Sequence, residues 1–307
     1  MAAPTIVIAG PTGVGKSDLA VGVAEAIGGE IVNFDSVQVY RGFDIGSAKP
    51  PVAIRQRVPH HLYDIVDADE ELNAADYARR AKTILAEVHD RGRPAILVGG
   101  TFFYLRALLG GLPEMPGRDE ALRARLRAIA DTPRGAARLH RWLLKIDPAR
   151  GRKIAAADRH RVERALEVYL LTGKPISHWP EPTADNPDEM PALKIALSLP
   201  RPTLVTALDA RVEAMYAAGL VEETRALLAR FPREARAFGT IGYREAAAVV
   251  TGELAPAAAI AETKRRTRAY AKRQMTWLRG ERNVQWLDAT TKETNLAAAL
   301  RLIEDNA

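Results

Sequence analysis

The chain has 307 residues, of which 47% are hydrophobic, and it carries a formal net charge of +6 at pH 7. This composition can bury a sizeable core and excludes a chain that is disordered as a whole. No apolar run reaches the roughly eighteen residues of a membrane span, and the N-terminus does not read as a signal peptide. Because there are no cysteines, disulfides, thiolate zinc sites and a cysteine nucleophile are also excluded. We expect a cytoplasmic protein without membrane contact.

The positive charge is concentrated in two stretches of the sequence. Residues 118–164 hold 14 Lys and Arg against 6 Asp and Glu, and residues 264–282 hold 8 against 1. A net charge of this size on two short stretches indicates a polyanionic partner such as nucleic acid. The alternative is a pair of solvated helix faces without a partner.

Strands and helices alternate in the first part of the chain. Apolar runs predict buried strands at residues 5–9, 30–34 and 95–98, and helical spacing predicts helices over 16–27 and from Asn73, as the N-cap, to about 90. This alternation is typical of a parallel sheet that is covered by helices on both faces.

The pattern then becomes purely helical and later returns to the first type. Helices are predicted over 119–130, 134–145 and 158–172, with Gly173 ending the last of them. A strand at 194–199, helices over 203–218, 243–251 and 257–278, and a strand at 284–287 follow. We therefore predict an α/β core over residues 1–112 and 191–307, interrupted by an all-helical insertion domain over residues 113–190.

The strand at 5–9 runs into a phosphate-binding loop. The residues Gly10, Pro11, Thr12, Gly13, Val14, Gly15, Lys16 and Ser17 match the pattern G-x-x-x-x-G-K-[ST] and open a helix, which makes the core a P-loop-type fold. Backbone N–H groups of such a loop surround a phosphate, Lys16 reaches across it, and Ser17 can ligate Mg²⁺. Most such loops bind a nucleoside triphosphate and pair with a magnesium-binding Asp after another strand. Here Gly99-Gly100-Thr101 follows the strand at 95–98, so a diphosphate is an alternative ligand.

Asp35 ends the second strand, at the edge of the sheet where ligands bind in open α/β folds. A carboxylate there can hold Mg²⁺, act as a general base or cap a turn. The chemistry of the residue alone leaves these three roles open.

Seven segments together resemble the tRNA dimethylallyltransferases, also called tRNA isopentenyltransferases, of the bacterial type. The segments follow the order and approximate spacing of that family: GPTGVGKS (10–17), DSVQVYRGFDIGSAKP (35–50), VPHHLYDI (58–65), LVGGTFFYLRALLGGL (97–112), RALEVYLLTGKP (164–175), GTIGYREA (239–246) and AKRQMTWLR (271–279). The resemblance implies transfer of a dimethylallyl group from dimethylallyl diphosphate to N6 of the adenine immediately 3′ of the anticodon in tRNA. It also implies a monomeric enzyme with Mg²⁺ as its cofactor.

The resemblance also assigns roles at the reaction centre. The loop Gly10–Ser17 would hold the diphosphate, with Thr12, Lys16 and Arg211 as catalytic residues and Ser17 on Mg²⁺. Asp35 would be the general base for the exocyclic amine of an adenine that is flipped into a channel. His60 corresponds to a channel residue, although a lone histidine is more often structural.

The remaining assignments concern contacts with tRNA. The helical insertion would clasp the anticodon stem, and Lys264, Arg268, Lys272 and Arg279 would track phosphates along one helix face. The residues assigned to tRNA beside Asp35 are Ser36, Val37, Gln38, Thr101, Arg123, Arg159, His160, Arg161, Val162, Glu163, Arg164, Gly239, Thr240, Ile241, Gly242, Tyr243 and Arg244. An isopentenyltransferase that acts on free adenine nucleotides and a small P-loop kinase are the alternative functions.

Overall fold

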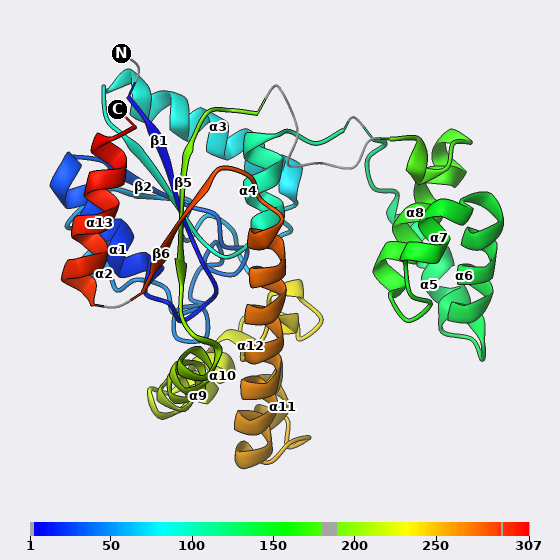
Figure 1. The fold of residues 1–307 in the computed structure, drawn as a ribbon. Helices are drawn as coiled ribbons and strands as arrows, with labels where there is room; N and C mark the ends of the chain where they lie inside the picture. The colour runs from blue at the N-terminus through cyan, green and yellow to red at the C-terminus, as the bar shows by residue number, and fades with distance from the viewer. Residues whose placement is uncertain (1–2, 114, 180–188, 290, 307) are drawn as a thin grey trace. The chain divides into compact units, whose positions relative to one another are not determined.

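The computed structural model describes residues 3–113, 115–179, 189–289 and 291–306. The chain separates into two units (Figure 1), one formed by Met1–Gly111 with Ala184–Ala307 and the other by Leu112–Thr183. The boundaries predicted from the sequence, 112/113 and 190/191, lie one and seven residues further along the chain. The backbone N–H of Met190 donates to the carbonyl of Leu109 over 2.9 Å, so the chain leaves and re-enters the first unit at neighbouring points.

The first unit is built on a six-stranded sheet in the order β3-β2-β4-β1-β5-β6, in which every paired strand is parallel. The strands are β1 (Thr5–Ala9), β2 (Glu30–Asn33), β3 (His60–His61), β4 (Ala95–Val98), β5 (Leu193–Ser198) and β6 (Val284–Asp288). All residues of β1, β2 and β4 are buried, which explains why apolar and polar residues do not alternate along them. Their polar residues, Thr5, Glu30 and Asn33, stand at strand ends and are buried too. The predicted parallel sheet is confirmed.

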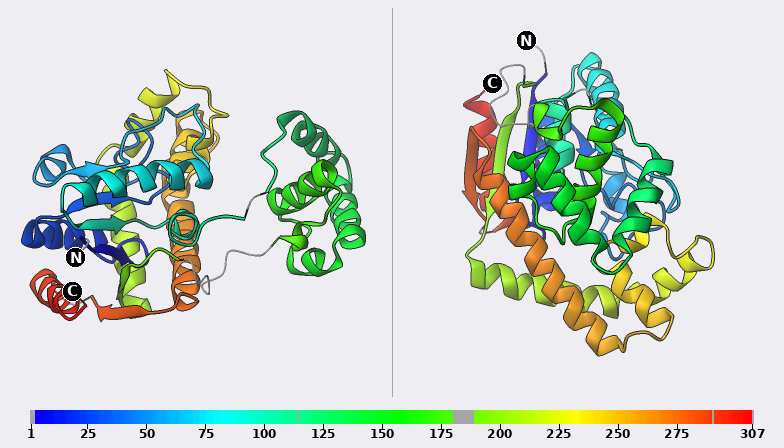
Figure 2. Two further views of the ribbon diagram at one scale, coloured as in Figure 1. Left: turned by 90° about the horizontal axis from the view of Figure 1, so that it is seen from above. Right: turned by 90° about the vertical axis from the view of Figure 1, so that its right-hand side faces the viewer.

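Helices cover both faces of this sheet (Figure 2). Ile6 and Ile8 of β1 face a core that they share with α1 (Lys16–Ile27) and α13 (Lys292–Glu304). Because side chains alternate along a strand, Val7 between them faces the opposite side, where α3 (Ala74–Asp90) and α4 (Phe102–Leu109) pack against each other. The short α2 (Val52–Arg55) lies between β2 and β3 in the sequence.

The helices between β5 and β6 form their own group beyond the sheet (Figure 1). They are α9 (Arg201–Ala217), α10 (Leu220–Leu228), α11 (Tyr243–Val250) and the long α12 (Pro256–Arg279), with a 3₁₀ turn at Arg236–Gly239. Helix α12 packs against both α9 and α11. It therefore connects this helical group with the end of the sheet, where the following strand β6 pairs with β5.

The second unit is all-helical, with α5 (Glu120–Ala130), α6 (Gly135–Ile146), α7 (Pro148–Lys153), α8 (Arg159–Thr172) and a 3₁₀ turn at Ile176–His178. Its own core contains Leu126, Leu139, Leu143 and Leu166. Gly173 ends α8 in the left-handed conformation at φ 71°, as expected for a residue without a side chain.

Three longer helices were missed by the sequence analysis. In α4 nearly every residue is apolar and six of the eight are buried, so no polar face marks its helical period. Helix α10 begins directly after Gly219, whose φ is 99°, and reads in the sequence as a continuation of α9. Helix α13 begins at the cap Thr291. Among the described residues, no helix combines the length and hydropathy that crossing a membrane requires.

Candidate functional site

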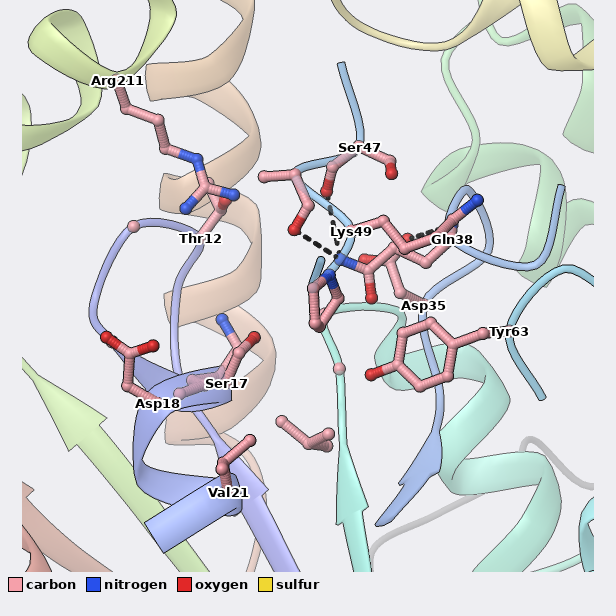
Figure 3. A pocket seen from close by; sticks show the side chains of 18 of the residues that line it. Thr12, Ser17, Asp18, Val21, Asp35, Gln38, Ser47, Lys49, Tyr63 and Arg211 are labelled. Carbon is pink, nitrogen blue, oxygen red and sulfur yellow. Dashed lines mark hydrogen bonds between the residues drawn. The ribbon is translucent and has the colours of Figure 1, made fainter. Parts of the chain in front are cut away.

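A pocket of about 370 Å³ lies at the carboxyl edge of the sheet (Figure 3). The loop between β1 and α1, Asp35 after β2 and Gly99-Gly100 after β4 line it together with side chains from α9 and α12. The pocket brings together four residues that the sequence analysis assigned to catalysis, Thr12, Lys16, Asp35 and Arg211.

The phosphate loop has the backbone that its glycines require. Gly10, Gly13 and Gly15 have φ values of 149°, 79° and 90°, which side-chain-bearing residues rarely adopt. A Cβ on Gly10 would lie 2.8 Å from the carbonyl oxygen of Leu197, and one on Gly13 would lie 2.8 Å from Leu208. Helix α1 starts at Lys16 without a side-chain cap, so its first N–H groups remain available to an anion.

Two cationic side chains lie at this loop, and both are half-buried. The Nζ of Lys16 donates to the carbonyl of Pro11 over 2.8 Å. Burial, and then the neighbouring Arg211, lower the pKa of Lys16 to about 7, although Asp35 acts in the opposite direction. Burial also lowers the pKa of Arg211, which comes from α9. Since the described residues provide no salt bridge to either cation, the pocket is electrostatically prepared for an anion.

Asp35 is held in a fixed orientation by its own loop. Its Oδ1 accepts hydrogen bonds from the backbone N–H groups of Val37 and Gln38, at 2.8 and 3.3 Å. Oδ1 of Asp35 therefore caps the turn formed by the next residues, which is one of the three roles considered from the sequence. Within the described residues no donor reaches Oδ2, which faces Gly100: a Cβ on that glycine would lie 3.4 Å away. One oxygen therefore fixes the carboxylate and the other remains available to a ligand.

Several residues assigned to tRNA lie next to Asp35. The Oγ1 of Thr101 accepts a hydrogen bond from the backbone N–H of Ser36 and donates to its hydroxyl, both at 3.0 Å. Gln38 lines the pocket and donates through Nε2 to the carbonyls of Ser47 and Ala48. Val37 is half-buried. The loop after β2 and the loop after β4 are thus joined at the rim of the pocket.

His60 does not line the pocket. Its Nδ1 lies 2.8 Å from the carbonyl of Val58 and its ring packs edge-on against Tyr63. Burial lowers the pKa of this imidazole, so the neutral ring is favoured. The geometry matches the structural role rather than the channel role that the family resemblance implied.

The predicted tRNA residues of the helical unit fall into two groups. The guanidinium of Arg123 forms two hydrogen bonds with the buried carboxylate of Glu167, at 2.7 and 2.8 Å, and Arg164 bonds to the same carboxylate. Val162 and Glu163 are buried within the unit. These four residues stabilise the unit in this structure, and their contact with tRNA stays a prediction. Arg159, His160 and Arg161 are exposed, and a contact of these with tRNA stays a prediction.

The segment Gly239–Arg244 also divides by burial. The Tyr243 side chain is fully buried, and its hydroxyl donates to Glu223 and accepts from the backbone of Gly46. Tyr243 packs the helical group against the loop after β2, and its assignment as a tRNA contact stays a prediction. Gly242 is also buried, Thr240 and Ile241 are half-buried, and Gly239 and Arg244 are exposed.

Among the pocket residues that were not predicted from the sequence, Gln274, Tyr270 and Lys49 form hydrogen bonds that shape the pocket. Gln274 and Tyr270 of α12 both donate to the carbonyl of Gly100, each at 2.9 Å. Lys49 has a side chain that is only 1% exposed and donates to Asp44, Asp64 and the carbonyl of Tyr40. The segments DIGSAKP and AKRQMTWLR were recognised in the sequence. No sequence signal, however, pairs Tyr270 and Gln274 with Gly100, which lies 170 and 174 positions away.

This fold and pocket define a P-loop-type α/β protein that is built to bind an anionic, phosphorylated ligand beside a carboxylate. The model of the IPP transferase family matches residues 38–281. A tRNA dimethylallyltransferase of Geobacter sulfurreducens is 46% identical over 92% of this chain and 91% of its own, and one of Syntrophobacter fumaroxidans is 42% identical over 98% and 88%. The chain belongs to the IPP transferase family of enzymes, which confirms the resemblance found in the sequence.

Solved structures lead to the same family. The tRNA isopentenylpyrophosphate transferase from Bacillus halodurans is 36% identical with a TM-score of 0.70, and the match covers 99% of this chain and 98% of that one. A eukaryotic dimethylallyltransferase described as acting on tRNA has a TM-score of 0.80 at 29% identity, and the match covers 99% of this chain and 79% of that one. The fold and the family are therefore supported by both comparisons.

Proposed function

We propose that this protein transfers the dimethylallyl group of dimethylallyl diphosphate to N6 of the adenine immediately 3′ of the anticodon in tRNA. The observation that carries the proposal is the pocket itself, in which the half-buried cations Lys16 and Arg211 line the same space as the carboxylate of Asp35. In Figure 3, Arg211 and Thr12 lie on one side of the pocket and Asp35 and Gln38 on the other. The names of the relatives support tRNA as the acceptor.

The cationic side would hold the diphosphate of the donor. As the carbon–oxygen bond of the donor breaks, negative charge grows on the departing diphosphate, and the ammonium of Lys16 and the guanidinium of Arg211 stabilise it. Such preorganised charges are most effective in a site with little water, and both cations are half-buried in the pocket. The N–H groups at the start of α1 add further positive potential.

The donor set of the loop fits a bound Mg²⁺. Ser17 lines the pocket, and no hydrogen bond engages its hydroxyl within the described residues. The described residues hold no cluster of three His, Asp or Glu, but Mg²⁺ commonly keeps water and phosphate oxygens and takes only one or two protein ligands. We propose Ser17 as its protein ligand, where the ion would neutralise charge on the diphosphate.

The carboxylate side would accept the adenine. Attack of N6 on the allylic carbon forms the N–C bond while the C–O bond to diphosphate breaks, and Oδ2 of Asp35 takes the proton that the amine loses. A positioned base of this kind contributes on the order of 10²–10⁴-fold. The adenine must leave the anticodon loop to reach this oxygen, and extrusion is least costly for an unpaired base. The residues that would contact it are Gln38, which lines the pocket, and Ser36 and Thr101, which are hydrogen-bonded to each other next to Asp35.

Transfer from a labelled donor tests the proposal directly. The protein is incubated with labelled dimethylallyl diphosphate and either tRNA or a mixture of AMP, ADP and ATP, and nucleosides are analysed by mass spectrometry. We expect dimethylallyladenosine only in tRNA, at the position 3′ of the anticodon. Transfer only to free nucleotides would contradict the proposal, as would γ-phosphate transfer from ATP with no use of the prenyl donor. That the enzyme is a cytoplasmic monomer stays a prediction.

A further inference from the structure

Gln274 of α12 connects two walls of the pocket that are far apart in the sequence. Its side chain is 2% exposed. The Oε1 atom accepts a hydrogen bond from the backbone N–H of Thr12 in the phosphate loop over 2.8 Å, and Nε2 donates to the carbonyl of Gly100 after β4 over 2.9 Å. One amide group therefore spans the gap between the phosphate loop and the opposite side of the pocket.

The second wall is shaped to receive this amide. Tyr270, one helical turn before Gln274, donates to the same carbonyl over 2.9 Å. A Cβ on Gly100 would lie 2.5 Å from Nε2 of Gln274 and 3.4 Å from Oδ2 of Asp35. Because Gly100 has no side chain, the amide of Gln274 and the free oxygen of Asp35 can both approach the backbone at this point.

The chemistry of the two bonds requires a group that accepts on one side and donates on the other. A glutamine amide does both and carries no charge, whereas an ionised carboxylate only accepts and a methionine does neither. Because the N–H of Thr12 donates to Gln274, α12 rather than the ligand fixes the turn of the phosphate loop at Thr12.

We propose that Gln274 is a positioning residue that sets the spacing between the phosphate loop and the wall formed by Gly100 and Asp35. The inference rests on the proposed function, since this spacing decides whether the allylic carbon of the donor and the amine of the acceptor meet in line. Gln274 acts through Thr12 on the diphosphate and through Gly100 on the acceptor side. Small errors in such an alignment cost on the order of 10²-fold in rate.

The experiment compares Gln274→Met with two controls in the full-length protein. Inorganic diphosphate binding is measured by calorimetry, and kcat and the donor KM by labelled transfer to tRNA. Gln274→Met should weaken diphosphate binding about tenfold and lower kcat on the order of 10²-fold. Tyr270→Phe keeps the bond from Thr12 to Gln274 and removes only one bond to Gly100, so it separates the effect of the Gly100 wall from that of the phosphate loop. Gln285→Met, the same substitution at an exposed position of β6, should match the unsubstituted enzyme in both measurements.

A carboxyl variant gives a readout that a merely structural role would not produce. In Gln274→Glu the ionised side chain repels the Gly100 carbonyl, but the protonated form donates to it and still accepts from Thr12. Burial favours the protonated form of such a group. We therefore expect kcat/KM and diphosphate affinity of this variant, each divided by the value of the unsubstituted enzyme at the same pH, to rise as the pH falls from 8 to 6.

Two results would overturn the inference: diphosphate affinity and turnover of Gln274→Met equal to those of the unsubstituted enzyme, or a flat pH ratio for Gln274→Glu. If Gln274→Met does not fold, as judged by thermal unfolding, the pH ratio decides. Diphosphate binding involves neither tRNA nor a prenyl group, so it tests the position of the loop separately. Failure of the unsubstituted enzyme to modify tRNA would instead refute the proposed function.

Discussion

At the scale of single residues, the two oxygens of Asp35 have different roles: Oδ1 fixes the orientation of the carboxylate, and Oδ2 is the proposed base. Oδ1 is engaged by Val37 and Gln38, so an amide in its place keeps those bonds but cannot take a proton. We expect Asp35→Asn to lower the single-turnover rate of transfer on the order of 10²–10⁴-fold, with tRNA affinity within several-fold by filter binding. Asp35→Ala, which also loses the cap, serves as the comparison. A rate for Asp35→Asn equal to that of the unsubstituted enzyme would remove the base from the mechanism.

Lys16 makes binding of the diphosphate dependent on protons. With its pKa lowered to about 7 by burial and by Arg211, the amine is mostly neutral at pH 8 in the free protein. An anion favours the ammonium, so binding of inorganic diphosphate at pH 8 should take up a proton at Lys16. Calorimetry in buffers of different ionisation enthalpy measures this uptake. Lys16→Met should lack it, and uptake of the same size in that variant would place the proton elsewhere.

The same pKa predicts a stability effect of known sign. Because the pKa of Lys16 in the folded protein lies below the ordinary lysine value of 10.5, the unfolded chain binds more protons between about pH 7 and 10.5. The stability contributed by this group therefore rises with pH across that window. Lys16→Met should therefore stabilise the ligand-free protein, on the order of 1–3 kcal/mol at pH 7. The difference should shrink toward pH 10 in urea unfolding. A destabilised variant at pH 7 would show that the buried ammonium has a stabilising partner.

At the scale of elements, the four cations of α12 do not form one uniform face. Lys264 pairs with Glu213 and Arg268 with Asp209, both on α9, whereas Lys272 and Arg279 are exposed and have no salt bridge within the described residues. Cations without a local counterion contribute most to the salt dependence of binding. Of the four cations predicted to contact tRNA phosphates, we therefore expect only Lys272 and Arg279, in the second half of α12, to contribute strongly.

This division predicts an asymmetric response to substitution. The double variant Lys272→Ala and Arg279→Ala should weaken tRNA binding. It should also make the negative slope of log affinity against log salt concentration less steep, by about 1.5–2. Lys264→Ala, at a paired position on the same helix, should change the slope less. Equal slopes for the double variant and the unsubstituted protein would mean that this half of α12 is only a solvated face.

Sequence patterns predicted elements where the cause is local. The strand β1, the phosphate loop and the glycine stop at Gly173 follow from apolar runs and backbone requirements, and Asn73 caps α3 by accepting from Ala75 and Asp76. The bridge from Gln274 to Thr12 joins residues 262 positions apart. No local sequence pattern encodes such a contact. The phosphate loop and Asp35 could therefore be predicted from the sequence, but the part of α12 in the pocket could not.

At the scale of the whole molecule, the helical unit is an insertion in the structural sense. Its core of leucines and the ion pairs around Glu167 lie within residues 112–183. The two ends of the first unit are held together by the hydrogen bond between Met190 and Leu109. Among the described residues, none of the insertion belongs to the sheet or lines the pocket of the first unit. We therefore predict that folding of the pocket does not depend on the proposed contact of the insertion with tRNA.

Removal of the insertion tests this separation. In the shortened protein a Gly-Ser linker replaces residues 113–188. Leu109 and Met190 are hydrogen-bonded to each other, so a short flexible linker can connect the two ends with little strain. We expect the shortened protein to unfold cooperatively and to bind inorganic diphosphate within a few-fold of the full chain, because Lys16, Arg211 and Gln274 keep their surroundings. Affinity for tRNA should fall at least about tenfold, since the stretch 118–164 carries a net positive charge. Unchanged tRNA affinity would contradict the role of the helical unit as the clasp, whereas lost diphosphate binding would show that the pocket depends on it.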